Sequence, residues 1–262
     1  MSGEGRLIDN LMVGDLKILG SVKASHVKRY CFEDFKTQPI CQVNNATTAL
    51  PSGTANTANT ALMPGTGNSF EYVAKGTQTI IGMGVLATGG CDVSGDQTDN
   101  DGREIVFGGG ITSAAVRTFT VGGRAFSARL KFSIVDVSGV DDCAFGFRKC
   151  AAYTANFDDY TDLATLNVIS GNITIETILN NAATTSTDTT DDWADGKTHE
   201  LKVSVDTNGA VTYAIDGQPP TTTAAFTFDS GDAVVPFLFF LQTADFSGAI
   251  TLQEFECGYD TL

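Results

Sequence analysis

Basic residues are scarce in this chain. Its 262 residues include 16 lysines and arginines against 31 aspartates and glutamates, a formal net charge of -15 at pH 7. Binding to a nucleic acid or an anionic lipid surface draws on basic side chains that neutralise phosphates, so the composition argues against both partners. An acidic exterior instead keeps copies of a protein soluble at high local concentration, because they repel one another.

The chain also lacks a continuous hydrophobic run. Its start, "MSGEGRLIDNLMVGDLKILG", has neither the basic first region nor the unbroken apolar region of a secretory signal, and no other run approaches membrane-spanning length. We therefore expect synthesis and folding in the cytoplasm, with no membrane partner.

The cysteine spacing that is typical of metal-binding sites is missing as well. None of the six cysteines forms a CxxC pair, and the two histidines, His26 and His199, offer few partners for a zinc site. We interpret most of the cysteines as small buried hydrophobic residues: Cys31, Cys41, Cys91, Cys143, Cys150 and Cys257. Cys31 and Cys257 lie near the two ends of the β-rich region, so a disulfide between them stays an alternative.

Phenylalanine and turn-forming residues are abundant. The chain has 17 phenylalanines and 28 glycines, and only 18% of its residues are charged, which favours strands over helices. From Phe70 onward, alternating apolar and polar runs bounded by turn residues predict successive strands. In "AFSARLKFSIV", for example, Phe126, Leu130 and Ile134 share one face, whereas "VPFLFFLQ", residues 235–242, predicts a central strand covered on both faces.

We divide the chain into an N-terminal β arm, residues 1–29, and one globular domain, residues 30–262. The first strand of the domain is predicted at "RYCFEDF", residues 29–35. A low-complexity excursion follows at about 42–69, where Ala, Thr, Asn, Gly and Pro cannot build a core of their own.

The arm repeats glycine and apolar residues every six positions, with Gly14 and Gly20 as markers. Strands of this length cannot cover their own apolar side, so we expect the following residues to contact a sister chain or another protein: Met12, Val13, Leu16, Ile18, Leu19 and Val22. The alternative is an arm folded back onto its own domain. Short "VxGxLxVxG" runs of this kind resemble N-terminal segments of phage fibre and decoration proteins, in which three chains wrap together.

A small basic cluster follows the arm in "KASHVKR". Lys23, Lys28 and Arg29 are unusual in so acidic a chain, and we expect them to contact an acidic surface such as a capsid shell. The alternative interpretation is a solvated linker.

The segment "ADGKTHELKVSVDTNGAVTYAIDGQPP", residues 194–220, resembles the hairpin of concanavalin A-like lectin and glucanase domains, including laminin G-like modules. The shared features are a "DGxxH" entry, a "LKVxVD" strand, an "NG" turn and a "YxIDG" return. This resemblance implies an all-β jelly-roll sandwich of two antiparallel sheets. It also implies that the strands "CFEDF" and "LQEFECGYD" lie side by side.

The wider pattern, "TDNDGREIVFGG" followed by Phe-rich strands and this hairpin, resembles virion structural proteins of tailed phages. The resemblance implies a capsid decoration (cement) or fibre protein on the outer capsid surface, made in the host cytoplasm. Its partners would be its own copies, as a homotrimer or dimer, and the major capsid protein or another virion protein. The alternatives are a glycan-binding module of a fibre or cell surface and a divergent glycosidase.

The carboxylates argue against an enzyme. Glucanases of this fold carry Glu-x-Asp-x-x-Glu on one strand, so that one carboxylate attacks and another donates a proton. The chain has no such segment; Glu254 and Glu256 share a strand face but read more naturally as solvent-facing residues. We predict a non-enzymatic protein.

Two weaker candidate sites remain. Asp96, Asp99 and Asp101 in "GDQTDNDGRE" crowd oxygen ligands as calcium loops do, but an acidic turn is the favoured interpretation and no cofactor is predicted; calcium is the first ion to test. Trp193, the only tryptophan, is the candidate for stacking on a sugar, with packing at a strand entry as the alternative.

Overall fold

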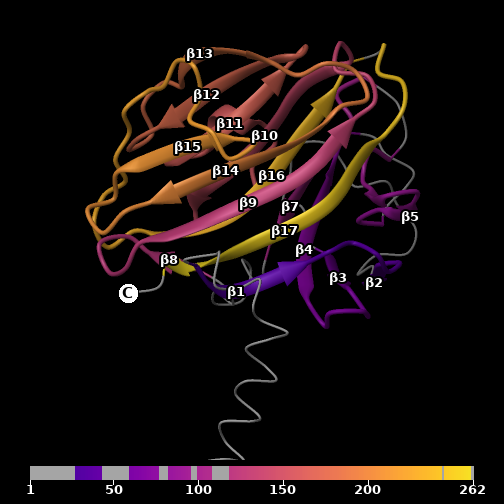
Figure 1. The fold of residues 1–262 in the computed structure, drawn as a ribbon, viewed down its shortest axis with the longest axis horizontal. Helices are drawn as coiled ribbons and strands as arrows, with labels where there is room; N and C mark the ends of the chain where they lie inside the picture. Colours follow the sequence, from indigo (N-terminus) through magenta and orange to yellow (C-terminus); the bar gives the residue numbers. More distant parts are fainter. Residues whose placement is uncertain are drawn as a thin grey trace, which may run out of the picture.

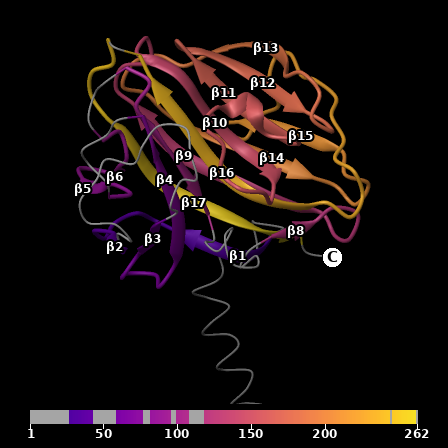
Figure 2. The ribbon, with the colours of Figure 1, turned by 180° about the vertical axis from the view of Figure 1, so that it is seen from behind.

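A computed structural model of the chain describes residues 27–42, 59–76, 82–95, 99–107, 118–243 and 245–260. Within these ranges the regular structure is strand, apart from the short 3₁₀ helix η2 (Phe157–Asp159). The strands form two antiparallel sheets that pack face to face (Figures 1 and 2), which is the two-sheet sandwich predicted from the sequence.

The seven-stranded sheet lies toward the viewer in Figure 1. Its strands run in the order β15 (Val211–Ile215), β14 (Thr198–Val205), β9 (Phe126–Ile134), β17 (Ile250–Asp260), β6 (Gly90–Asp92) and β5 (Val85–Ala87), and β1 (Val27–Glu33) also pairs with β17. The predicted β14–β15 hairpin turns at Asn208 and Gly209, and Gly209 has a φ of 87°, which glycine adopts without strain.

The ten-stranded sheet forms the other layer. Its strands run in the order β13 (Thr185–Asp192), β12 (Asn172–Ile178), β11 (Leu163–Ile169), β10 (Val140–Lys149), β16 (Ala233–Gln242), β7 (Gly102–Val106), β4 (Ser69–Lys75), β3 (Asn59–Leu62) and β2 (Ile40–Gln42), and β8 (Phe119–Thr120) also pairs with β16. The strand predicted to be central, β16, lies between β10 and β7.

Aromatic rings from both sheets fill the space between them. Phe255 of β17 stacks on Phe107, which follows β7, with ring centroids 3.9 Å apart, and Phe126 of β9 lies 5.1 Å from Phe147 of β10. Phe126 and Ile134 are both fully buried, which confirms the predicted alternation of β9. Burial of each such side chain contributes about 1.5–3 kcal/mol.

The strands β1 and β17 lie side by side, as the resemblance implied. They pair antiparallel from Val27, which lies opposite Asp260. The described part of β1 therefore starts before the predicted boundary after residue 29. Lys28 and Arg29, assigned to the arm, belong to β1.

Cys31 lies opposite Cys257 in this pairing, and both are buried. The Cys31 Sγ donates a hydrogen bond to Asn68 Oδ1 at 3.3 Å, as a thiol does. Thiols rather than a disulfide therefore occupy this position in the structure.

The structure describes the second part of the low-complexity excursion predicted at about 42–69. Residues 59–62 form β3, which pairs with β4, and Ala61 and Met63 are fully buried. Residues 43–58 lie outside the described residues. The second half of the excursion therefore belongs to the sandwich.

The loop of residues 150–162 covers the outer face of β16. It places Phe157 against Phe239, with ring centroids 5.7 Å apart, and Tyr160 against Phe237 at 6.1 Å. This cover explains why β16 is apolar on both faces, since its inner face lies in the main core.

A buried ionic group lies beneath this loop. Fully buried Glu104 of β7 accepts hydrogen bonds from Arg148 Nε at 2.8 Å and from the Tyr160 hydroxyl at 2.6 Å, and it lies 3.1 Å from Lys75 Nζ. Burial, opposed by the charge of Glu104, lowers the pKa of Lys75. These contacts fasten the loop to the sheet.

Candidate functional site

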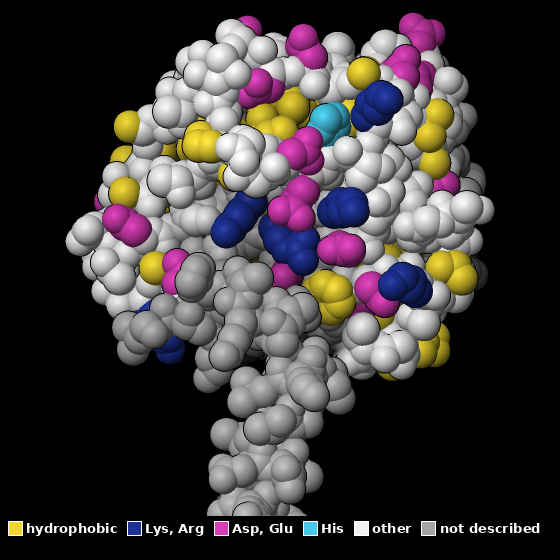
Figure 3. All heavy atoms as spheres, viewed as in Figure 1, with side chains coloured by type: hydrophobic (Ala, Val, Ile, Leu, Met, Phe, Trp, Pro, Cys, Tyr) yellow, Lys and Arg dark blue, Asp and Glu magenta, His cyan; other side chains and the backbone are white. Residues whose placement is uncertain are grey.

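The outer face of the seven-stranded sheet carries a group of charged side chains (Figure 3). Arg129 of β9 contacts Glu200 of β14 at 2.6 Å, and Glu254 and Glu256 of β17 at 3.3 and 3.0 Å. Burial acts to lower the pKa of Arg129, but Glu200 and Glu256 hold it above its ordinary value. Glu254 and Glu256, which were considered above as a glucanase-type carboxylate pair, therefore both contact Arg129.

Lys131 lies two residues further along β9 on the same face. The strand register places it directly opposite Glu200 on β14 and Glu254 on β17. Both carboxylates contact Arg129 instead, and Lys131 makes no ion pair with any described residue. Its ammonium group is therefore available to a ligand.

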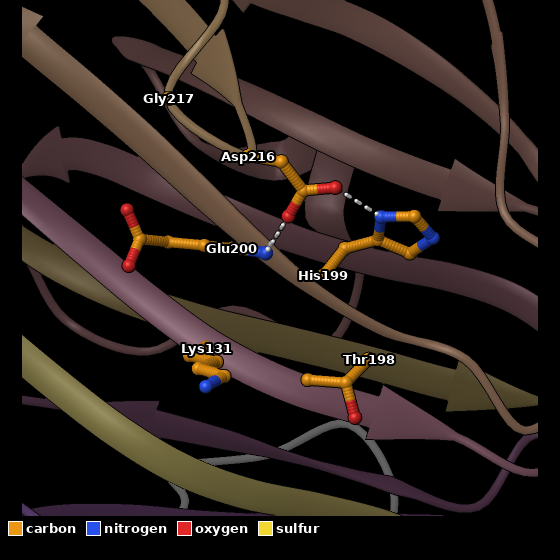
Figure 4. A pocket seen from close by; sticks show the side chains of 6 residues that line it. All are labelled: Lys131, Thr198, His199, Glu200, Asp216 and Gly217. Atoms are coloured by element: carbon orange, nitrogen blue, oxygen red, sulfur yellow. Dashed lines mark hydrogen bonds and ion pairs between the residues drawn. The ribbon is translucent and has the colours of Figure 1, made fainter.

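An open pocket of about 300 Å³ lies beside Lys131, at the end of the β14–β15 hairpin away from the Asn-Gly turn (Figure 4). Strand β9 contributes one lining residue, β14 three, and the turn after β15 two. These six residues are polar, charged or glycine: Lys131, Thr198, His199, Glu200, Asp216 and Gly217.

His199 and Asp216 close one side of the pocket. The His199 Nδ1 lies 2.6 Å from Asp216 Oδ2, and Asp216 Oδ1 accepts a hydrogen bond from the Glu200 N–H at 2.8 Å (Figure 4). Partial burial acts to raise the pKa of Asp216, but these hydrogen bonds and the charges of His199 and Lys131 hold it below its ordinary value. Since an ionised carboxylate only accepts, the His199 Nδ1 carries the shared proton.

The turn after β15 explains the residue types of the "YxIDG" motif. Asp216 and Gly217 have φ values of 51° and 76°, a left-handed conformation that aspartate and glycine tolerate better than most residues. This turn directs Asp216 back toward His199 of the "DGxxH" motif. The two motifs therefore shape the pocket as well as the hairpin.

Among the residues that line the pocket, most acceptor oxygens are already hydrogen-bonded to the protein, whereas several donor groups are not. Both oxygens of Asp216 and one oxygen of Glu200 already accept from protein groups. Lys131 keeps three N–H donors, and Thr198, whose Oγ1 accepts from Gln253 at 3.1 Å, keeps its own O–H. A ligand rich in oxygen atoms therefore finds free donors in Lys131 and Thr198, whereas the carboxylates of Asp216 and Glu200 already accept hydrogen bonds from protein groups.

Trp193 does not present its ring to solvent. It is 1% exposed, its ring centroid lies 4.6 Å from that of Phe132 and 4.7 Å from that of His199, and its Nε1 donates to the Lys197 carbonyl at 3.1 Å. The buried ring of this candidate residue is therefore not placed to stack on a sugar in this structure. The packing alternative holds: the indole supports His199 from the core.

Two of the three aspartates proposed for calcium are described. Asp99 is exposed in a turn and Asp101 is buried, while Asp96 lies outside the described residues. In the part of the chain that the structure describes, no group of three His, Cys, Asp or Glu side chains has the arrangement of a metal site.

A second polar cluster, which the sequence did not predict, lies on the outer face of the ten-stranded sheet. The buried Asn167 of β11 donates to Asp142 of β10 at 2.7 Å and to Glu176 of β12 at 2.8 Å. Burial raises the pKa of Asp142 to about 6 and also raises the pKa of Glu176. Such shifts occur in structural networks as well as in active sites, and Asn167 also accepts from the Cys143 N–H, so this cluster joins three strands.

The arm residues predicted to make contacts lie outside the described residues: Met12, Val13, Leu16, Ile18, Leu19, Val22 and Lys23. His26 does so too. Their role stays a prediction.

No helix among the described residues is long and apolar enough to span a membrane. No model of a known protein family matches the chain, and no curated protein matches it in sequence.

Solved structures share its fold. The carbohydrate recognition domain of Emp46p, in its potassium-bound form, has a TM-score of 0.51 and 8% identity over 73% of this chain and 89% of that one. Lectin II from Ulex europaeus has a TM-score of 0.48 and 11% identity over 77% and 96% of the two chains. The CBM2 module of the evolved Dit protein of Lactobacillus casei BL23 phage J-1 has a TM-score of 0.48 and 12% identity over 90% and 96%.

The identities are low enough that these likenesses concern the fold alone, and only the first reaches a TM-score of 0.5. Together with the two antiparallel sheets, the likeness to the Emp46p domain confirms the predicted lectin-type jelly-roll sandwich.

Proposed function

We propose that this chain is a non-enzymatic glycan-binding protein and that the pocket lined by Lys131, Thr198 and Asp216 holds a sugar. The observation that carries the proposal is the lining itself. Its carboxylates are fixed by protein donors, while an ammonium and a hydroxyl remain open, which is the mixture that sugar hydroxyls require. The fold that this chain shares with the Emp46p carbohydrate recognition domain supports the proposal, but that likeness does not identify the binding site.

A glycan array with two matched variants tests this proposal. Thr198→Trp fills the pocket from an exposed strand position, and Thr207→Trp makes the same change at the opposite end of the hairpin. We expect the wild-type hits to disappear with Thr198→Trp and to persist with Thr207→Trp. Hits that survive Thr198→Trp would place the glycan elsewhere.

We also propose that copies of the chain associate and decorate a virion surface through the N-terminal arm, as a homotrimer or dimer. One structural observation favours the association of copies, apart from the arm: a group of exposed apolar side chains lies at one end of the sandwich, near where Figure 1 labels β2, β3 and β5. These are Ile40, Leu62, Val85 and Leu86. Gln38 joins the two sheets here, since its Nε2 donates to the Gly84 carbonyl and its Oε1 accepts from the Leu86 N–H.

The strands β2 and β5 end their sheets among the described strands and contain no charged residue. Natural edge strands usually carry charges that block pairing, and chains of charge -15 approach one another most easily where charge is absent. A second copy of this chain is therefore the occupant we propose for this end.

A truncation that begins at Val27 tests the arm, because it keeps the whole of β1. We expect it to fold and to lose binding to purified capsids, whereas Val85→Lys in the full chain should lower the oligomeric state in sedimentation velocity. Capsid binding that survives the truncation would contradict the role of the arm.

A further inference from the structure

We infer, building on the proposed glycan-binding function, that the ligand of this pocket is an acidic glycan with a carboxylate or sulfate group placed against Lys131. The inference concerns the charge of the ligand. It rests on how the lysines and carboxylates of this face are paired.

Three lysines without an ion pair lie on, or directly before, the two strands that line the pocket. Among the lysines whose side chains the structure describes, Lys36, Lys75 and Lys149 each contact a carboxylate. The other three make no ion pair with a described residue: Lys131, Lys197 and Lys202. Lys131 lines the pocket, Lys197 directly precedes Thr198, and Lys202 follows two residues after Glu200 on β14.

The carboxylates nearest to Lys131 are engaged elsewhere. Glu200 and Glu254, which face Lys131 across the strands, both contact Arg129. Asp216 is held by His199 and by the Glu200 N–H. An anionic group that reaches Lys131 therefore breaks no ion pair between this lysine and a described carboxylate.

The donors at the pocket suit a singly charged group. Figure 4 shows Lys131 and Thr198 on the same side of the pocket, with Asp216 turned toward His199. One ammonium and one hydroxyl can serve two oxygens of a carboxylate or sulfate. Because the lysines are solvent-accessible, each contact should change affinity by about two- to fivefold.

Matched pairs of glycans test the inference. Each acidic oligosaccharide that binds in the array is titrated by calorimetry beside its neutral form, which is carboxyl-methylated or desulfated. We expect wild type to bind the acidic form several-fold more tightly at low salt, and the ratio to shrink at high salt because salt screens exposed charges. Comparing the methylated and desulfated forms tells which anionic group is recognised.

Two variants assign the effect to Lys131. Lys131→Gln should remove most of the preference for the acidic form, and Lys131→Arg should keep it. Lys36→Gln makes the same change of charge at an exposed lysine paired with Asp34, outside the pocket lining, and should leave the preference unchanged.

The outcomes separate this inference from the function on which it rests. Equal affinity for both members of each pair, unchanged by Lys131→Gln, would overturn the acidic-ligand inference while glycan binding stands. A wild-type protein that binds nothing on the array would overturn the proposed function itself.

Discussion

The His199 Nδ1 lies 2.6 Å from Asp216 Oδ2, and this contact joins the start of β14 to the turn that follows β15. It lies between the buried Trp193 on one side and the open pocket on the other. The pair thus connects the core of the sandwich to the proposed ligand site.

Replacing Asp216 with asparagine should weaken the fold in a pH-dependent way. The pKa of Asp216 is lowered in the folded state, so its contribution to stability is present above the unfolded pKa, near 3.8, and is lost as the pH falls below that value. Because the carboxylate is half exposed, we expect a loss of only about 0.5–1 kcal/mol at pH 7. Urea unfolding at several pH values measures it, and an equal loss at pH 3 would contradict this explanation.

Asp142→Asn should stabilise the protein at neutral pH. The folded pKa of Asp142, about 6, exceeds its unfolded value of 3.8, so this group favours folding at low pH and that contribution is lost as the pH rises through 6. Asparagine keeps an acceptor for Asn167 and carries no charge. We expect a gain on the order of 2 kcal/mol above pH 7 and none near pH 4, by urea unfolding. A variant that is less stable at both pH values would refute the prediction.

Trp193→Phe should lower stability without changing glycan binding. Phenylalanine keeps a ring near Phe132 but loses volume and the hydrogen bond to the Lys197 carbonyl, so we expect a cost of about 1–3 kcal/mol. Thermal unfolding and the array measure the two effects separately. Loss of glycan binding in a variant of unchanged stability would restore Trp193 as a ligand contact.

Glu104→Gln should be strongly destabilising. It leaves the guanidinium of Arg148 buried without its counter-charge beneath the 150–162 loop, which costs about 3–5 kcal/mol in comparable cases. Glu254→Gln removes a partner of Arg129 at a partly exposed site and should cost less than about 1 kcal/mol. Similar losses in urea unfolding for both variants would show that burial does not set the strength of these pairs.

The sequence predicted most of the long strands that bury one or both faces, but it missed the short buried strands β3 and β6. "LATLNVI" coincides with β11, and "VPFLFFLQ" lies within β16. The sequence did not predict strand β13, "TSTDTTDD". This strand forms an edge of the ten-stranded sheet, and Thr189 is its only completely buried residue. A polar edge strand has no hydrophobic alternation, so nothing local distinguishes it from an acidic turn.

The pocket was only partly predictable. The hairpin motifs indicated where His199 and Asp216 lie in the chain but not that they meet, since their contact depends on the left-handed turn after β15. Lys131 comes from a different part of the sequence and joins them through the pairing of β9 with β14. Trp193 was a candidate because its neighbours in "DDWADG" are polar, and the sequence alone did not show that its ring turns inward against Phe132.

The most direct test of glycan binding at this pocket is an NMR titration of the isotope-labelled protein with an oligosaccharide selected on the array. Our account predicts that the backbone signals of Lys131, Thr198 and Gly217 shift in a saturable way, while those of Asp142 and Asn167 on the opposite sheet stay unchanged. Saturable shifts centred on Asp142 and Asn167, with the pocket signals unmoved, would contradict it.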